Sequence, residues 1–296
     1  MSLIEWFTEP FALGFQQRAL LAAVLAGLMC SIVGTWLVLR GMSFFGDAFT
    51  HGVVPGIAAA VAFEFSPLLG AAIAAAVMVL LIEVVHRTTS LSQDTAIGLL
   101  FVGMLALGVV IISRVDSYTG SLTSILFGDA LGVTREGLVR QAVLGAFVVA
   151  ASLVLYRPLL TLSFNESKAE LLGMHPRMAH TALLILIATA VIGSFQAVGT
   201  LLVFGLLVGP AATAALVART VPRMMAWAAV LAVCSVWLGL VLSYHLGTAA
   251  SATMAIIPVI LFFLVLPIST SVNSRRQLRE GAGEVVGAAV TAVEPG

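Results

Sequence analysis

Apolar stretches of about twenty residues follow one another along most of this 296-residue chain, with only short polar connectors between them. A helix needs about 20 residues to cross ~30 Å of hydrocarbon. Lipid offers no partner for a free N–H or C=O group, so such stretches must satisfy their backbone within helices. We predict an all-α polytopic membrane protein with eight or nine transmembrane helices, some short or broken. The candidate spans are 13–39, 47–64, 67–86, 95–113, 139–156, 179–195, 198–217, 225–245 and 250–268.

The composition excludes a soluble domain. Apolar residues make up 60% of the chain and charged residues 9%, with a mean hydropathy of +1.12. A soluble domain carries about 25% charged residues because its surface meets water. The formal net charge is zero, so no basic surface for nucleic acid is predicted. We expect one transmembrane permease domain over 1–270 and a polar cytoplasmic tail over 271–296, partly disordered.

The positive charges predict the orientation, because Lys and Arg concentrate in short cytoplasmic loops. If the N-terminus lies outside, ten of the 14 basic residues face the cytoplasm and the C-terminus is cytoplasmic. The ten are Arg40, Arg87, Arg157, Lys168, Arg177, Arg219, Arg223, Arg275, Arg276 and Arg279.

Ionisable residues inside a membrane span are costly, so each is a functional candidate. The second predicted span begins with Asp47 and carries His51 one helical turn later. Positions i and i+4 share a helix face, so this carboxylate and imidazole can bind one cation. The pair suits Zn²⁺, Mn²⁺ or Fe²⁺, and the lack of a thiolate argues against Cu⁺. Pro55 cannot donate to the His51 carbonyl, which frees that oxygen in a broken helix of the kind found at transporter sites.

Three glycines, Gly46, Gly52 and Gly56, flank this pair and allow neighbouring backbones to approach closely. Two ligands make half of a four-coordinate site, so a two-fold dimer would complete it with a second Asp47 and His51. The structural alternative is that Asp47 caps the second span while His51 bonds to a neighbouring helix.

Other polar residues near the span ends are weaker candidates. Glu64 lies about 25 Å from Asp47 at 1.5 Å per helical residue, and is a candidate outer gate or an ordinary interfacial carboxylate. We interpret His245 as an interfacial histidine. Glu83, at the end of the third span, is expected to meet cytoplasmic water.

The longest predicted cytoplasmic loop covers residues 157–178. Asn165 is a good helix N-cap and Gly173 a good C-cap, which predicts a short amphipathic helix between them. Such a helix is either an interfacial connector or a docking element for a cytoplasmic motor.

Several segments resemble the permease subunits of bacterial zinc/manganese (and iron) ABC importers, and the resemblance covers nearly the whole chain. The most specific segment is GMSFFGDAFTHGVVPG, in which Asp47 and His51 stand four residues apart. The family usually has Asp where this chain has Asn165, and either residue can cap a helix. The other matching segments are SQDTAIGLLF (92–101), LFGD (126–129), FNESKAELLG (164–173) and VGTLLVFGLLVGPAATA (198–214).

The resemblance implies a homodimeric permease in the bacterial cytoplasmic (inner) membrane. Its partners would be two cytoplasmic ATP-binding subunits and an extracellular or periplasmic metal-binding protein. It implies Asp47 and His51 as the metal site, transported Zn²⁺ or Mn²⁺, and no permanently bound cofactor. The residues implied in coupling to the ATPase are Asn165, Glu166, Ala169, Glu170 and Gly173.

Two other transport functions remain open at this point: a proton-coupled secondary metal transporter, and an ABC permease for an organic metal chelate. The spans lack an H-E-x-x-H motif, which argues against an intramembrane enzyme. The chain also lacks the phosphate-loop pattern G-x-x-x-x-G-K-[S/T], so ATP hydrolysis is expected on separate subunits.

Overall fold

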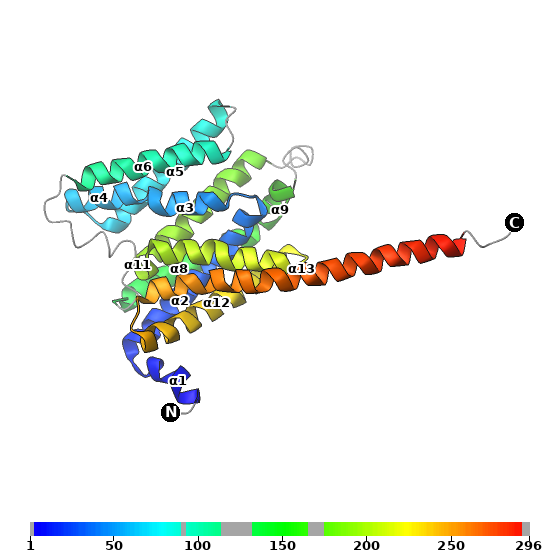
Figure 1. The fold of residues 1–296 in the computed structure, drawn as a ribbon. Coiled ribbons are helices and arrows are strands. Elements are labelled where there is room, and N and C mark those ends of the chain that lie inside the picture. Colours follow the sequence, from blue (N-terminus) through cyan, green and yellow to red (C-terminus); the bar gives the residue numbers. More distant parts are fainter. Residues whose placement is uncertain (1–2, 90–92, 114–131, 165–174, 292–296) are drawn as a thin grey trace.

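The computed structural model describes residues 3–89, 93–113, 132–164 and 175–291. These residues form helices and connecting turns, with no strand among them (Figure 1). In chain order the helices are α1 (Leu3–Thr8), η1 (Glu9–Ala12), α2 (Gly14–Leu39), α3 (Ser43–Gly52), α4 (Val54–Ala62), α5 (Pro67–Thr88), α6 (Gln93–Ile112), α8 (Arg135–Val154), α9 (Tyr156–Phe164), α11 (Pro176–Val217), α12 (Val221–Leu246) and α13 (Ala250–Thr291).

The predicted set of membrane spans is confirmed. Within the described residues, nine helical stretches are long and apolar enough to cross a membrane. Helices α3 and α4 together supply the second span, and α11 supplies the sixth and seventh. The second span begins at Ser43 rather than at residue 47, because the chain turns at Gly41 (φ 68°) and re-enters the helix after Met42.

The helices are apolar on their outer faces as well as their inner ones. Large exposed hydrophobic side chains include Leu80 on α5, Leu99 on α6 and Phe263 on α13. A soluble helix would carry charge on that face, whereas here lipid takes the place of water. The same exposure that would cause a soluble protein to aggregate therefore fits a membrane surface.

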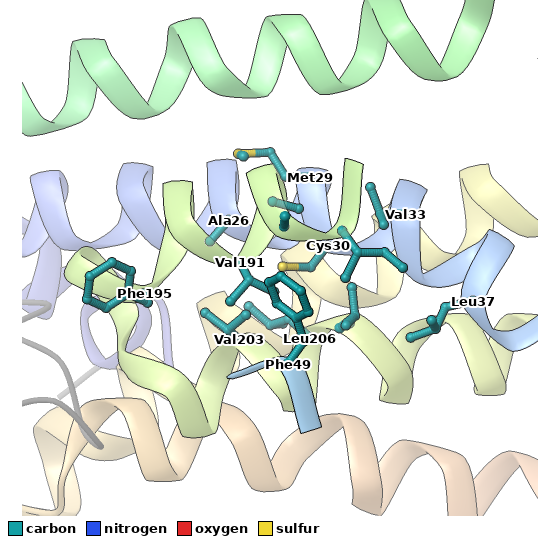
Figure 2. Packing of buried hydrophobic residues seen from close by; sticks show 14 of the residues in the cluster. Ala26, Met29, Cys30, Val33, Leu37, Phe49, Val191, Phe195, Val203 and Leu206 are labelled. Carbon is teal, nitrogen blue, oxygen red and sulfur yellow. The ribbon is translucent and has the colours of Figure 1, made fainter. Parts of the chain in front are cut away.

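Helices α2 and α11 form the centre of the bundle (Figure 2). Met29, Cys30 and Val33 of α2 are fully buried against the two halves of α11. Phe49 of α3 points into the same cluster, so α3 is anchored to the core by one face. This anchoring leaves the opposite face of α3 free for function.

The two halves of α11 run in opposite directions. In the first half, His180 lies beside Arg40 and Gly193 lies beside Met29, so this half is antiparallel to α2. In the second half, Leu207 lies against Gly34, further toward the C-terminal end of α2. The reversal occurs near Gly199, whose φ of 77° and ψ of 162° are not helical. The predicted break between the sixth and seventh spans is therefore confirmed.

The last helix, α13, continues past the ninth span to Thr291 and projects away from the bundle (Figure 1). The partial disorder predicted for the tail over 271–296 is not tested by this helix and stays a prediction. Good helix formers such as Arg, Gln, Leu and Glu are frequent at 275–280, which favours continuation of the helix. The division between permease domain and tail at residue 270 stays a prediction.

Candidate metal site

Asp47 and His51 lie on the same face of α3. Oδ1 of Asp47 and Nε2 of His51 are 3.6 Å apart, too far for a hydrogen bond. In the described chain no hydrogen bond to another helix holds either side chain. Their lone pairs therefore remain available to a cation. The prediction that this spacing brings the carboxylate and the imidazole together is confirmed in geometry.

The structure does not support the alternative in which Asp47 caps the helix. Met42 occupies the N-cap position of α3, and Asp47 lies more than a turn inside the helix. Asp47 is 31% exposed and His51 29% exposed, so each side chain is only partly covered by its own chain. A partly exposed ionisable pair inside a span requires a cover other than lipid, because lipid solvates charge poorly.

The other face of α3 holds the pair in place. Phe45 and Phe49 are completely buried in the core, and Thr50 donates a hydrogen bond to the Asp47 carbonyl at 2.9 Å. Phe101 of α6 lies edge-on to the His51 ring, with 5.9 Å between ring centroids. This aromatic contact limits how far the imidazole ring can turn. The sequence did not indicate that α6 would supply an aromatic neighbour for His51.

The helix break after the pair is smaller than the sequence suggests. Only Val53 separates α3 from α4, and Pro55 stands in the first turn of α4. The Val53 N–H faces the His51 carbonyl from only two residues away, which is not a hydrogen bond of normal length and angle. That Pro55 leaves this oxygen free stays a prediction.

The flanking glycines do permit close packing, as predicted. A Cβ atom at Gly56 of α4 would overlap the Gly70 carbonyl of α5, and one at Gly52 would overlap Met78 of α5. A Cβ at Gly46 would approach Leu207 of α11 to 2.7 Å. Helices α3 and α4 are thus held between α5 and α11, most closely at the crossing of Gly56 and Gly70, where a larger residue would meet backbone.

The other candidate residues that the structure describes do not join the pair. Glu64 lies beyond the end of α4, exposed, with a left-handed φ of 56°. His245 stacks on Trp6 and its Nε2 lies 2.8 Å from the Trp6 carbonyl, so it fastens α1 to the end of α12. The predicted coupling residues Asn165, Glu166, Ala169, Glu170 and Gly173 lie outside the described residues.

Within the described part of the chain, Asp47 and His51 would supply only part of a metal ion's coordination shell. Among the described residues, no three His, Cys, Asp or Glu side chains gather where they could hold a metal ion. Asp47 and His51 together provide one oxygen-donor and one nitrogen-donor group, the kinds that suit a divalent transition metal. Further ligands would have to come from a second molecule, from water or from outside the described residues.

Comparison with known proteins gives a consistent result. Residues 12–269 match the ABC 3 transport family. The chain is 34% identical over 263 residues to the manganese transport system membrane protein MntC of Halalkalibacterium halodurans, covering 89% of this chain and 90% of that one. It is 31% identical over 264 residues to the chelated iron transport system membrane protein YfeD of Yersinia pestis, covering 89% of each.

A solved structure, "PsaBC from Streptococcus pneumoniae in complex with Fab", superposes with a TM-score of 0.78 at 30% identity, over 89% of this chain and 95% of that chain. The relatives are membrane subunits of transport systems and not enzymes, as the sequence predicted. From its helical spans and from these matches, the chain belongs to the ABC 3 transport family.

Proposed function

We propose that this chain is the transmembrane permease subunit of an ATP-driven importer for a divalent transition metal, Mn²⁺ or Zn²⁺. The observation that carries the proposal is the pair Asp47 and His51, held 3.6 Å apart on a span and partly exposed. Carboxylate and imidazole suit these ions. The manganese and iron names of the relatives agree with this ligand chemistry, with manganese supported more directly than zinc.

Two copies would form the translocation pathway. One chain supplies two ligands, and a two-fold axis near α3 would supply two carboxylates and two imidazoles. An apolar groove of about 380 Å³ between α11 and α13 lies beside this helix. Phe204 lines the groove, and a Cβ at Gly46 would lie 3.6 Å from its ring. A second copy seated along the groove would cover Asp47 and His51 from lipid.

The arrangement of the helix ends supports the proposed topology. Arg40, Glu83 and His180 come from three spans and lie at one end of the bundle, all on the side predicted to be cytoplasmic. Trp6 and His245 meet at an end predicted to face outward. With these assignments the C-terminus lies in the cytoplasm, and residues 165–173 would meet the ATP-binding subunits.

The proposed cycle is alternating access. An external binding protein delivers the ion to an outward-open cavity, with Glu64 attracting cations at the mouth. The ion pauses on Asp47 and His51 of both copies, and closure of the ATPases then tilts the spans to open the inner side. Few ligands suit such a site, since an ion bound too tightly would not leave.

The decisive experiment reconstitutes the chain with its ATP-binding subunits and binding protein in liposomes and measures Mn²⁺ uptake. We expect uptake that requires ATP, survives collapse of the proton gradient and is reduced by competing Zn²⁺. Uptake driven by a proton gradient without ATP would instead support a secondary transporter.

A chelate permease is the second transport candidate, favoured by the chelated-iron name of one relative. The Asp47–His51 pair argues against it, because a chelated metal brings its own ligands. Uptake of an intact chelate, with free Mn²⁺ excluded, would overturn the proposed substrate class.

A further inference from the structure

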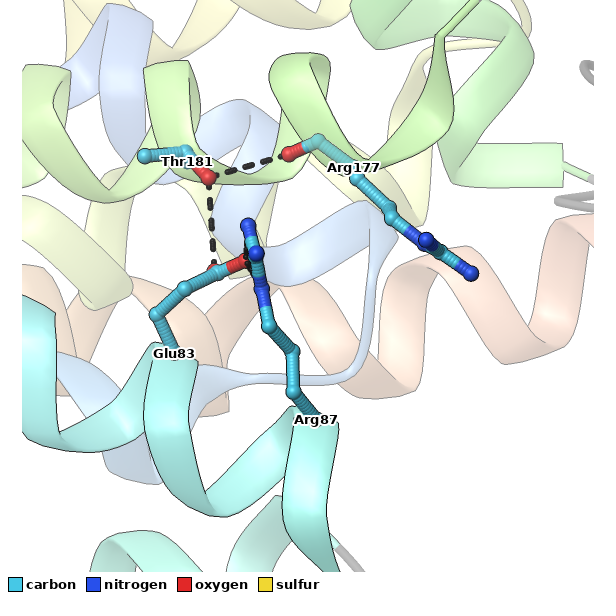
Figure 3. A network of polar contacts seen from close by, with 4 residues as sticks. All are labelled: Glu83, Arg87, Arg177 and Thr181. Carbon is cyan, nitrogen blue, oxygen red and sulfur yellow. Dashed lines mark hydrogen bonds and ion pairs between the residues drawn. The ribbon is translucent and has the colours of Figure 1, made fainter.

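A network of polar side chains joins α5 to the first turns of α11 (Figure 3). Glu83 of α5 is held by Arg87, whose Nη2 and Nε lie 2.7 and 2.8 Å from Oε1 of Glu83. The second carboxylate oxygen, Oε2, accepts from the hydroxyl of Thr181 of α11 at 3.3 Å. Glu83 is only 12% exposed, so it faces α11 rather than the water that the sequence predicts.

The Thr181 hydroxyl has two acceptors but only one proton. Besides Oε2 of Glu83 it can donate to the Arg177 carbonyl of its own helix, at 3.0 Å. If the hydroxyl turns fully to Arg177, Glu83 still has Arg87 as its partner. The link between α5 and α11 can therefore break while each side chain keeps one partner on its own helix, which keeps the free-energy difference between linked and unlinked states small.

The neighbouring residue on α11 makes a second link. Nδ1 of His180 lies 3.1 Å from Nη1 of Arg40, the residue at which α2 ends. A guanidinium only donates hydrogen bonds, so Nδ1 of this buried histidine is the acceptor. Arg40 is followed by the short turn into α3, the helix that carries Asp47. Two consecutive residues of α11 thus contact two separate elements.

Both elements lead to the proposed metal site. Helix α5 packs on α3 through Met78 and Gly52, and on α4 through the crossing of Gly70 and Gly56. The crossing of Gly70 and Gly56 is backbone-close, so α5 cannot shift without moving α4, which joins α3 at Val53. At Gly52 the contact is with the side chain of Met78. At its other end the network lies at the start of α11, directly after the segment proposed to meet the ATPases.

We propose that Glu83 and Thr181 are positioning residues of the transport cycle, forming a releasable contact that couples the start of α11 to α5 and hence to Asp47 and His51. This inference rests on the proposed ATP-driven transport. The contact is made when the inner end of the bundle is closed, and it breaks when ATP-dependent movement of α11 opens that end. Release costs little because both side chains retain partners on their own helices.

The test compares variants of the complete transporter, with its ATP-binding subunits, in nanodiscs and liposomes. Thr181→Val removes the hydroxyl at nearly constant shape, and Thr181→Ser retains it. The matched control is Thr189→Val, because among described residues Thr189 bonds only within α11, to the Ile185 carbonyl at 2.8 Å. Amide hydrogen exchange at 82–88 and 176–182 reports the contact, and the number of Mn²⁺ ions imported per ATP hydrolysed reports coupling.

We expect Thr181→Val to accelerate exchange in both segments by about two- to tenfold, as for loss of one hydrogen bond of ordinary net strength, because Glu83 keeps Arg87 as a partner. We also expect at least a roughly twofold fall in ions imported per ATP. Thr181→Ser and Thr189→Val should match the wild type. Faster exchange with an unchanged number of ions imported per ATP would show that the contact serves stability alone, and would overturn the proposal. No change in either quantity would also overturn it. Absence of ATP-dependent uptake in the wild type would instead refute the proposed function, with the exchange comparison unaffected.

Discussion

Oδ1 of Asp47 and Nε2 of His51 are 3.6 Å apart on one face of α3. Two ligand atoms bound to one ion at about 2.1 Å in tetrahedral geometry are separated by about 3.4 Å. The two side chains therefore need only a small rotation to bind the same ion. The buried Phe45 and Phe49 on the opposite face fix the helix, so these two groups of the proposed site are already in place without a metal ion.

Replacing either ligand should abolish transport without preventing insertion. Asp47→Asn keeps the side-chain volume but loses the charge, and His51→Ala loses the nitrogen ligand. Loss of a ligand should reduce Mn²⁺ uptake at least about 100-fold, more than outer-shell changes at metal sites do. Initial uptake rates in proteoliposomes, normalised to inserted protein, measure this.

Ser43→Ala is the matched control, since Ser43 lies on the same helix one turn before Asp47 and should transport normally. Wild-type rates in both ligand variants would show that the ion does not pass through this pair.

The crossing of α4 and α5 should be intolerant of a single methyl group. Gly56→Ala would place a Cβ into the Gly70 carbonyl and should destabilise the protein by about 1–3 kcal/mol. Gly103→Ala on α6 is the control because a Cβ there meets nothing within 4 Å. Thermal unfolding in detergent should show a lower Tm only for the first variant. An equal Tm for both would mean that the helices do not cross at this distance.

The turn between the two halves of α11 should require glycine. Gly199 has φ 77° and ψ 162°, a region that is essentially restricted to glycine, whereas Gly247 has φ 63° and ψ 31°, which asparagine can adopt. Gly199→Asn should therefore cost about 1–3 kcal/mol and Gly247→Asn much less. Unfolding midpoints of the two variants provide the comparison, and tolerance of Asn at both positions would argue against a tight turn at Gly199.

If Glu64 attracts cations to an outer mouth, its effect should depend on salt. Glu64→Gln should lower uptake roughly two- to fivefold at subsaturating Mn²⁺ and low ionic strength, and the difference should vanish near 1 M salt. Glu136→Gln is the control, an exposed acidic residue in the first turn of α8 on the same predicted side. A deficit that persists at high salt would point to a direct ligand role or to misfolding instead.

Most of the fold was predictable from the sequence because helices that cross a lipid bilayer must meet strict limits of length and hydropathy. A span must be about 20 apolar residues long and helical, so hydropathy alone located all nine spans found among the described residues. Three spans begin four residues earlier than predicted, at Ser43, Arg135 and Val221. Polar or charged residues near these starts, such as Ser43, Glu136 and Arg223, lower the local hydropathy of segments that are nevertheless helical. The pair Asp47 and His51 was predictable because i and i+4 spacing depends only on helix geometry.

Contacts between distant helices were not predictable in the same way. Nothing in the sequence pairs Phe101 with His51, or Thr181 with Glu83, because these contacts depend on how the helices pack in three dimensions. Glu83 illustrates the error that results. Its position near a span end suggested contact with water, whereas α11 covers it.

The most direct test of the account asks whether His51 binds the transported ion. Pulsed EPR of Mn²⁺ bound to the purified transporter in nanodiscs detects nitrogen ligands through their modulation of the electron spin echo. We predict nitrogen modulation in the wild type and in His175→Ala, which alters an exposed histidine outside the site, and its loss in His51→Ala. Nitrogen modulation that persists in His51→Ala, or that is absent from the wild type, would contradict the proposed metal site.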